Sequence, residues 1–148
     1  MNQEISPAYV SFEQAKWLKE KGFNQRTKMV WLYSLGKQHL REVHLSLELN
    51  DAEYNAPEQW QVVEWLRVNH GIWILVLPQD RSGINFRIDM SEYPSHALFF
   101  TIIKYEKDMS CKELINTSDD KGELFLHFDI PQEAYSAAFD YIKDNNLI

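Results

Sequence analysis

The segment from Asn55 to Pro78, NAPEQWQVVEWLRVNHGIWILVLP, constrains the fold more than any other part of the chain. Pro57 suits the first turn of a helix, because its ring fixes φ and the N–H it lacks would have no intrahelical partner there. At about 100° per residue, the apolar residues that follow cover well over half of the helix circumference. They are Trp60, Val62, Val63, Trp65 and Leu66, with Val68 beyond them. We therefore expect a helix that other parts of the protein cover on most sides.

The same segment also predicts a strand. Gly71 is expected to end the helix, because glycine readily adopts the left-handed conformation that follows a helix C-terminus. The next residues, from Ile72 to Leu77, are apolar at both odd and even positions. Strands of this composition are typically buried on both faces. We therefore predict that Ile72 to Leu77 form a central strand of a sheet.

Further elements precede and follow this segment. Ser11 and Gln14 have the spacing of a capping box, which predicts a helix from Phe12 to Lys21 that Gly22 ends. Apolar and alternating patterns predict strands at 29–35, 43–49, 84–90, 96–105 and 124–128, and the strand at 43–49 is expected to have one wet face. The remaining expectations are a turn at Gly36 and Lys37, loops at 50–56 and 106–122, and a final helix from 131 to about 144.

The order of these elements indicates an α+β fold. Runs of strands with helices between them favour a mainly antiparallel sheet over a doubly wound parallel one. We expect about five to six strands in this sheet, with three helices packed on it. A chain of 148 residues can bury a sizeable core without a disulfide or a metal, so a single domain over 1–148 is expected.

The composition indicates which kinds of partner and which cell compartment to expect. The formal net charge of −7 argues against general nucleic-acid binding, for which a basic surface is the usual requirement. Cys111 is the only cysteine, so an intramolecular disulfide is impossible and a reducing compartment is expected. The first residues lack a basic lead followed by an apolar run, and no apolar stretch reaches membrane-spanning length. We expect a cytoplasmic protein without a membrane partner.

Patterns typical of metal and cofactor sites are absent from the sequence. The five histidines show no pair at helical spacing, and none lies near Cys111. The five glycines stand singly, so no phosphate-binding loop is predicted. Cys111 lies beside Lys112 and Glu113 in a polar stretch, which favours an inert thiol over a nucleophile. We predict neither a metal nor a cofactor.

One alternative is a small enzyme that uses a polar sheet face. The residues that could converge on such a face, if their strands are neighbours, are His44, Glu48, Arg87, Asp89 and His127, together with Ser46 and Asn85. The same pattern is expected of a solvated antiparallel sheet with cross-strand charge pairs. A third hypothesis, an acidic nucleic-acid mimic, rests on the net charge alone.

The aromatic content points to protein binding. Five tryptophans and seven tyrosines exceed what the core of one small domain needs, and aromatic residues are favoured at protein interfaces. The residues whose positions could leave one side facing a partner are Trp17, Tyr54, Trp60 and Trp65. Lys21 belongs to the basic edge of the first helix and could meet an acidic partner. We predict a non-enzymatic binding protein whose partner is a protein, and that partner could be a second copy.

Four segments together resemble a group of short proteins encoded by phages and prophages of gut bacteria. They are AYVSFEQAK at 8–16, KEKGF at 19–23, the segment from Ala56 to Ile72, and PQEAY at 131–135. The resemblance implies a small intracellular accessory protein of a mobile element in a bacterial host cell. It implies no activity, so it assigns no functional residue.

Overall fold

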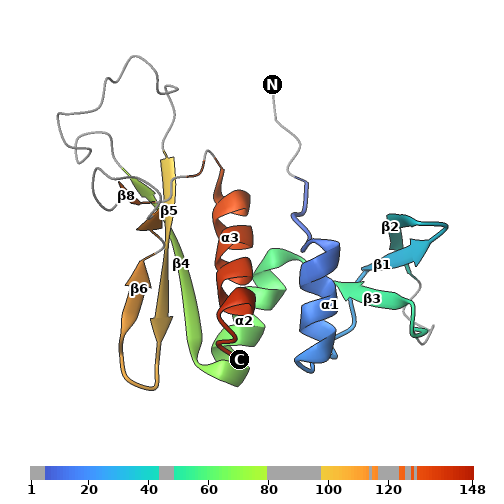
Figure 1. Cartoon of the computed structure of the whole chain (residues 1–148), viewed down its shortest axis with the longest axis horizontal. Coiled ribbons are helices and arrows are strands. Elements are labelled where there is room, and N and C mark those ends of the chain that lie inside the picture. The colour runs from blue at the N-terminus through green and yellow to red at the C-terminus, as the bar shows by residue number, and fades with distance from the viewer. Residues whose placement is uncertain are drawn as a thin grey trace, which may run out of the picture. The chain divides into compact units, whose positions relative to one another are not determined.

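The computed structural model describes residues 6–43, 49–79, 98–113, 115–116, 124–125, 128 and 130–148. The chain forms two compact units, one from residues 1–70 with 139–148 and the other from residues 71–138. Figure 1 shows their helices and strands. The prediction of a single domain over 1–148 stays a prediction.

The first unit begins with helix α1 (Phe12–Glu20), which has the predicted capping box. Ser11 Oγ accepts a hydrogen bond from the backbone N–H of Gln14 at 3.2 Å, and the backbone N–H of Ser11 donates to Gln14 Oε1 at 3.1 Å. Gly22 follows with φ of 88°, as expected for a residue that ends a helix. The predicted helix and its start at Phe12 are confirmed, and its last residue is Glu20, one residue before the predicted end.

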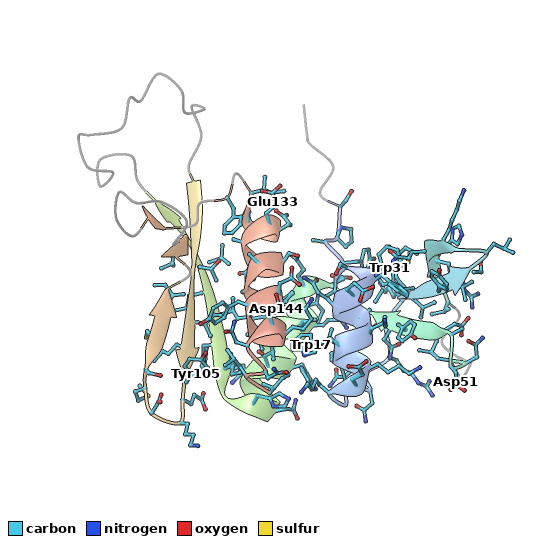
Figure 2. The ribbon with its side chains drawn as sticks, viewed as in Figure 1. Trp17, Trp31, Asp51, Tyr105, Glu133 and Asp144 are labelled. Atoms are coloured by element: carbon cyan, nitrogen blue, oxygen red, sulfur yellow. The ribbon has the colours of Figure 1, made fainter. Side chains whose placement is uncertain are left out.

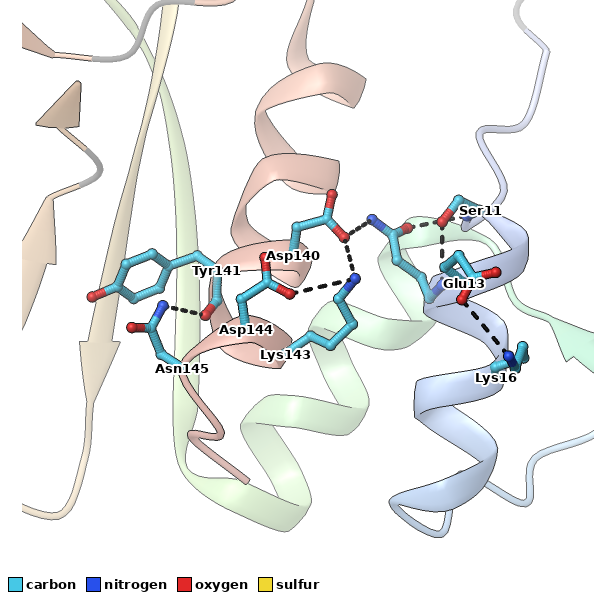
Figure 3. Close-up of polar contacts among 9 residues, drawn as sticks. Ser11, Glu13, Lys16, Asp140, Tyr141, Lys143, Asp144 and Asn145 are labelled. Atoms are coloured by element: carbon cyan, nitrogen blue, oxygen red, sulfur yellow. Dashed lines mark hydrogen bonds and ion pairs between the residues drawn. The ribbon is translucent and has the colours of Figure 1, made fainter. Parts of the chain in front are cut away.

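The buried side chain of Gln14 also ties α1 to the end of helix α3 (Pro131–Asp144). Gln14 Nε2 donates to Asp140 Oδ1 at 3.1 Å, and Asp140 also pairs with Lys143 at 3.4 Å (Figure 3). An unpaired amide would be costly to bury, so this contact fixes the C-terminal turns of α3 beside α1.

The first unit also contains a three-stranded antiparallel sheet in the order β2-β1-β3. Its strands are β1 (Met29–Ser34), β2 (Lys37–Glu42) and β3 (Glu53–Ala56). β1 and β2 are joined by the two residues Leu35 and Gly36, with φ of 52° and 73°. On the face toward α1, Phe12 contacts the rings of Trp31, Tyr33 and Tyr54 at centroid distances of 5.4–6.3 Å. The indole N–H of Trp31, labelled in Figure 2, donates to the carbonyl of Val10.

Three sequence predictions for this sheet need correction. The turn lies at Leu35 and Gly36, one residue before the predicted position, because Lys37 pairs with Ser34. The second strand ends at Glu42, and neither Val43 nor Leu49 is in a strand; residues 44–48 lie outside the described part of the chain. The predicted loop at 50–56 contains β3, whose sequence Glu-Tyr-Asn-Ala is too short and polar to reveal a strand before its pairing with β1 is known.

The predicted helix is present as α2 (Gln59–His70), but it begins two residues after Pro57, which is therefore not in its first turn. Protein also covers less of it than expected. Val62, Trp65 and Leu66 are buried, as their spacing on one helical face requires. Trp60 and Val68 are 64% and 62% exposed, so the expectation that the helix is covered on most sides is wrong for these two residues. Apolar residues outside the contact face stay in water because neighbouring elements cover only one sector of the helix.

The second unit is built on an antiparallel sheet in the order β4-β5-β6. Its strands are β4 (Ile72–Gln79), β5 (Leu98–Tyr105) and β6 (Cys111–Glu113). A two-stranded sheet, β7 (Ile115–Asn116) with β8 (Leu124–Phe125), accompanies it. The first turns of α3 lie against β5, where the buried hydroxyl of Thr101 donates to the carbonyl of Ala134 at 3.1 Å (Figure 1). The final helix is confirmed with the bounds Pro131–Asp144.

The α+β class with antiparallel pairing and three helices is confirmed. The prediction of one sheet of five to six strands is wrong, since the described strands form three separate sheets. β5 begins within the strand predicted at 96–105, and β8 covers the start of the strand predicted at 124–128. The strand predicted at 84–90 lies outside the described residues. Within the described residues, no helix has both the length and the apolar character needed to cross a bilayer.

Candidate protein-binding surface

One face of β4 is apolar and open to solvent. Trp73, Leu75 and Leu77 are each 37–39% exposed. Ile72 and Ile74, which alternate with them along the strand, are buried. Because side chains alternate between the two faces of a strand, the three exposed residues share one face. The prediction that this strand is buried on both faces is therefore wrong, and in the described sheet β4 lies at one end of the strand order.

The strand register identifies the neighbours of this face. Trp73 lies opposite Lys104 on β5, and Lys104 lies opposite Cys111 on β6. Leu75 lies opposite Ile102, which is half-buried. Directly opposite residues of antiparallel strands point to the same side of the sheet. The exposed side of the sheet therefore carries apolar side chains from two strands, with a lysine and a free thiol beside them.

A groove of about 490 Å³ runs along this side of the sheet. It is lined by Trp73, Leu75, Lys104, Glu106 and Met109. We refer to these five residues together with Leu77 as the β4 face. Protein-binding grooves typically combine an apolar floor with a few polar groups at the edge, and the β4 face has this composition.

Glu106 holds the indole ring of Trp73 in place at one end of the β4 face. Trp73 Nε1 donates to Glu106 Oε1 at 2.6 Å, and the backbone N–H of Glu106 donates to the carbonyl of Gly71 at 2.9 Å. Gly71 has φ of 63°, and a Cβ atom at this position would lie 3.4 Å from Glu106 Cβ. Glycine thus permits the backbone turn into β4 through its positive φ, whereas an added Cβ atom would make an ordinary van der Waals contact with Glu106.

The turn between β5 and β6 presents Met109 at the groove. Asp108 Oδ1 accepts hydrogen bonds from the hydroxyl and the backbone N–H of Ser110, at 2.6 Å and 2.9 Å. These bonds, above all the one from the hydroxyl, stabilise the carboxylate and lower the pKa of Asp108 below its ordinary value. Met109 has φ of 58° and is 65% exposed, so an apolar side chain stands in water on a backbone conformation that costs energy.

The charges at the edge of the β4 face are of both signs. Glu106 is exposed and is hydrogen-bonded to Trp73. Lys104 is half-buried beside Trp73, and it forms no ion pair with any residue that the structure describes. A partially covered cation without a carboxylate gains from one supplied by a partner, because its solvation is already reduced.

The five residues predicted to contact a partner belong to the first unit, and their exposure differs. Trp60 is the most exposed, and its indole N–H donates to Glu58 Oε2 at 2.6 Å. Tyr54 is half-buried, and Lys19 Nζ lies 4.9 Å from its ring centre. Trp17 and Trp65 are 5% and 7% exposed, and Figure 2 shows Trp17 among the side chains beside α1. Lys21 Nζ donates to the backbone oxygen of Ile148. Burial leaves Trp17 and Trp65 little surface for a partner.

Trp17 and Lys21 also line a second, more polar hollow of about 300 Å³ between α1 and the end of α3. Its three lysines are Lys16, Lys21 and Lys143. Each already has an oxygen partner: Glu13, the backbone of Ile148, and Asp140 with Asp144, respectively. These contacts already occupy the three ammonium groups, so the hollow has little to offer an anion.

The polar sheet face considered as an active site lies outside the described residues. This applies to His44, Glu48, Arg87, Asp89 and His127, and also to Ser46 and Asn85. Across the part of the chain that the structure describes, no three His, Cys, Asp or Glu side chains gather in a way that could hold a metal ion.

Sequence reasoning did not identify the β4 face. Its residues lie in a run that is apolar at every position, and such a run does not reveal whether its second side is covered. The sequence does contain one signal of this exposed face: Lys104 and Glu106 lie two residues apart at the end of a later apolar strand. Polar residues with this spacing indicate a side of the strand that reaches water.

Comparison of this chain with known protein families, with curated proteins and with solved structures finds no match.

Proposed function

We propose that this chain is a non-enzymatic protein that acts by binding a protein partner through the β4 face. The observation that carries the proposal is the exposure of Trp73, Leu75 and Leu77 on one side of a regular strand. Contiguous apolar side chains in water are unfavourable by about 25 cal/mol per Å², so their placement on one face is best explained by a partner that covers them.

The chemistry of the β4 face supports binding rather than catalysis. The groove is lined by apolar side chains, one lysine and one carboxylate, and that carboxylate is already hydrogen-bonded to Trp73. A general acid or base needs a reacting group within hydrogen-bond reach and a suitably placed second polar group. Aromatic and methionine side chains, in contrast, are the residues enriched at protein interfaces.

The resemblance to short phage and prophage proteins supplies the proposed setting. In that setting the chain is an accessory protein of a mobile element, and it covers a surface of another protein in the cytoplasm of a bacterial host. The proposal requires no cofactor, since the binding energy comes from apolar burial and a charge pair at the edge.

Site-specific photo-crosslinking in the native host tests this proposal. A benzophenone side chain in place of Leu75 is expected to form a covalent adduct with a protein. The matched control carries the same group in place of Val68, an exposed apolar residue of α2 that does not belong to the β4 face. Adducts at position 75 but not at position 68 support the proposal. No adduct at 75, or equal adducts at both positions, would contradict it.

A further inference from the structure

We infer that the β4 face binds an amphipathic helix of another protein, and that this helix carries a carboxylate beside its apolar side chains. This inference rests on the proposed function and specifies the chemistry of the partner. Three properties of the sheet support it. A helix already covers the opposite face, the open apolar strip has the dimensions of a short helix, and Lys104 is half-buried without a carboxylate from the residues that the structure describes.

Helix α3 covers the face of this sheet that lies opposite the β4 face. Ile74 and Ile103 are paired in the register and are buried on that side. Thr101 is buried there too, and its hydroxyl donates to the carbonyl of Ala134 on α3 at 3.1 Å. A sheet with apolar side chains on both faces is stable when each face packs against another layer. The α3 layer is supplied by this chain, and a partner helix supplies the second layer.

The apolar strip of the β4 face has the dimensions of a short helix. Trp73, Leu75 and Leu77 lie along β4, and Ile102 on β5 lies directly opposite Leu75. The distance from Trp73 to Leu77 is about 14 Å at about 3.4 Å per strand residue, which about nine residues of α-helix match. A helix of about 10 Å diameter covers two strands that are about 4.8 Å apart. Side chains at i and i+4 of a helix are about 6 Å apart along its axis, close to the roughly 6.8 Å between alternate strand residues.

The apolar character of the strip favours a helix over an extended peptide. A helix satisfies its own backbone N–H and C=O groups, so it presents only side chains to the strip. An extended peptide laid across Leu75 and Leu77 would bring backbone polar groups against side chains that cannot form hydrogen bonds with them. We therefore expect a partner segment whose apolar residues recur at intervals of three and four.

Lys104 determines the charge that the helix must carry. It lies on the middle strand of the sheet, opposite Trp73 on β4 and Cys111 on β6. A helix packed on Trp73 removes further water from the half-buried ammonium group, and a carboxylate on the helix compensates for this loss. Glu106 differs, because it follows the last residue of β5, is exposed and already accepts the Trp73 hydrogen bond. Its charge stays in water at the rim, so we expect an acidic residue on the helix beside Lys104.

Selection from a displayed library of random peptides on the full chain tests this inference. Peptides of about 16 residues are long enough for about four helical turns. The enriched sequences should share apolar residues at helical spacing and an acidic residue beside them. A synthetic peptide with the consensus sequence should bind wild type and Val68→Lys equally and should not bind Leu75→Lys. The inference is overturned if no sequence is enriched, if the apolar residues alternate as in a strand, or if the acidic residue is absent.

A charge exchange between the chain and the consensus peptide tests the role of Lys104. Fluorescence anisotropy of the labelled peptide measures the dissociation constant, and circular dichroism confirms that each variant is folded. Lys104→Glu should weaken binding by about tenfold or more, because like charges then face each other. Replacement of the acidic residue of the peptide by lysine should weaken binding to wild type equally and restore binding to Lys104→Glu. Glu106→Gln should change the dissociation constant by less than about twofold, since a charge at the rim contributes little. Failure of the exchanged pair to recover affinity would exclude the ion pair.

Photo-crosslinking from position 75 separates this inference from the proposed function. If position 75 crosslinks to another protein but the selection or the charge exchange fails, binding through the β4 face stands and the acidic helix is wrong. An adduct with twice the mass of the chain would identify a second copy as the partner. An adduct with a segment of the same chain outside the sheet would show that the chain covers this face itself. Either result overturns a helix of another protein. If position 75 gives no adduct at all, the proposed function itself fails.

Discussion

Trp73 and Glu106 are joined by a 2.6 Å hydrogen bond from the indole N–H to Oε1, across the end of the β4–β5 pair. The bond fixes the ring at the edge of the groove and leaves 38% of the residue exposed. A ring held in this position can contact a partner with little further loss of conformational freedom. A hydrogen bond rather than burial thus fixes the orientation of the Trp73 ring on the β4 face.

Removal of this acceptor is expected to release the Trp73 ring. In Glu106→Ala the indole N–H turns to water, so the loss of folding stability should stay below about 1 kcal/mol, as for a hydrogen bond that solvent can replace. The Trp73 indole signal in a ¹H–¹⁵N spectrum should shift, and its exchange with water should accelerate. Glu106→Gln serves as the control and should change both quantities far less. Equal spectra for the two variants would contradict this role of Glu106.

Gly71→Ala is expected to destabilise the second unit. The substitution places a Cβ on a backbone with φ of 63° and 3.4 Å from Glu106 Cβ. The left-handed conformation alone should cost about 1–2 kcal/mol. Gly22→Ala is the matched control, because Gly22 has φ of 88° but a Cβ atom added there would meet nothing within 4 Å. Urea unfolding should show losses of similar size for the two variants, because a Cβ atom 3.4 Å from Glu106 Cβ makes an ordinary van der Waals contact. A much larger loss for Gly71→Ala would contradict positive φ as the main cost.

Leu35→Asn is expected to stabilise the β1–β2 hairpin. Leu35 is fully exposed and has φ of 52° at the first position of a two-residue turn. Asparagine followed by glycine is the preferred sequence for such a turn, so the free energy of unfolding should rise by roughly 0.5–1 kcal/mol. Leu35→Val should lower it, because a β-branched side chain disfavours positive φ. Thermal unfolding of both variants measures the effect, and a decrease for Leu35→Asn would be inconsistent with the turn described.

Met109→Gly should stabilise the fold and weaken binding at the same time. Glycine relieves the positive φ at position 109, which is worth about 1 kcal/mol, and removes an exposed apolar side chain from the groove. Urea unfolding and photo-crosslinking from position 75 measure the two effects. A variant that is more stable but crosslinks from position 75 as efficiently as wild type would show that Met109 contributes nothing to binding through the β4 face.

His70 is expected to titrate below its ordinary value of about 6.5. Partial burial lowers the pKa of His70 by disfavouring the imidazolium, and the nearby positive charge of Lys21 lowers it further. The unfolded chain therefore binds a proton more readily than the folded chain, so stability should decline as the pH falls below about 6.5. An NMR titration of the His70 ring gives the pKa directly. Lys21→Gln should raise this pKa toward its ordinary value, and an unchanged pKa would exclude the contribution of Lys21.

The sequence predicted those features that depend on neighbouring residues. The capping box of Ser11 and Gln14, the end of α2 at Gly71 and the bounds of α3 each follow from local chemistry, and each is present. Features that depend on distant pairing were missed. β3 is a strand because β1 lies beside it, and Trp60 is exposed because its sector of α2 faces away from the contacts that bury Val62 and Leu66.

The β4 face illustrates the same limit for function. Composition directs attention to the aromatic residues as candidates for binding, but it selects tryptophans of the first unit. Two of these, Trp17 and Trp65, are buried, whereas Trp73 was assigned to the core and is exposed. Which tryptophan reaches solvent depends on the elements that cover each face, and local sequence does not contain that information.

Hydroxyl-radical footprinting of the dilute, monomeric chain tests the central claim most directly. Three other tryptophans serve as internal references for the oxidation rate, since Trp60 is exposed and Trp17 and Trp65 are buried. If the β4 face is open to solvent, Trp73 and Met109 should oxidise well above the rate of the two buried tryptophans and become protected when the partner binds. If Trp73 instead oxidises as slowly as Trp17 in the isolated chain, the β4 face is not exposed, which would contradict partner binding through it.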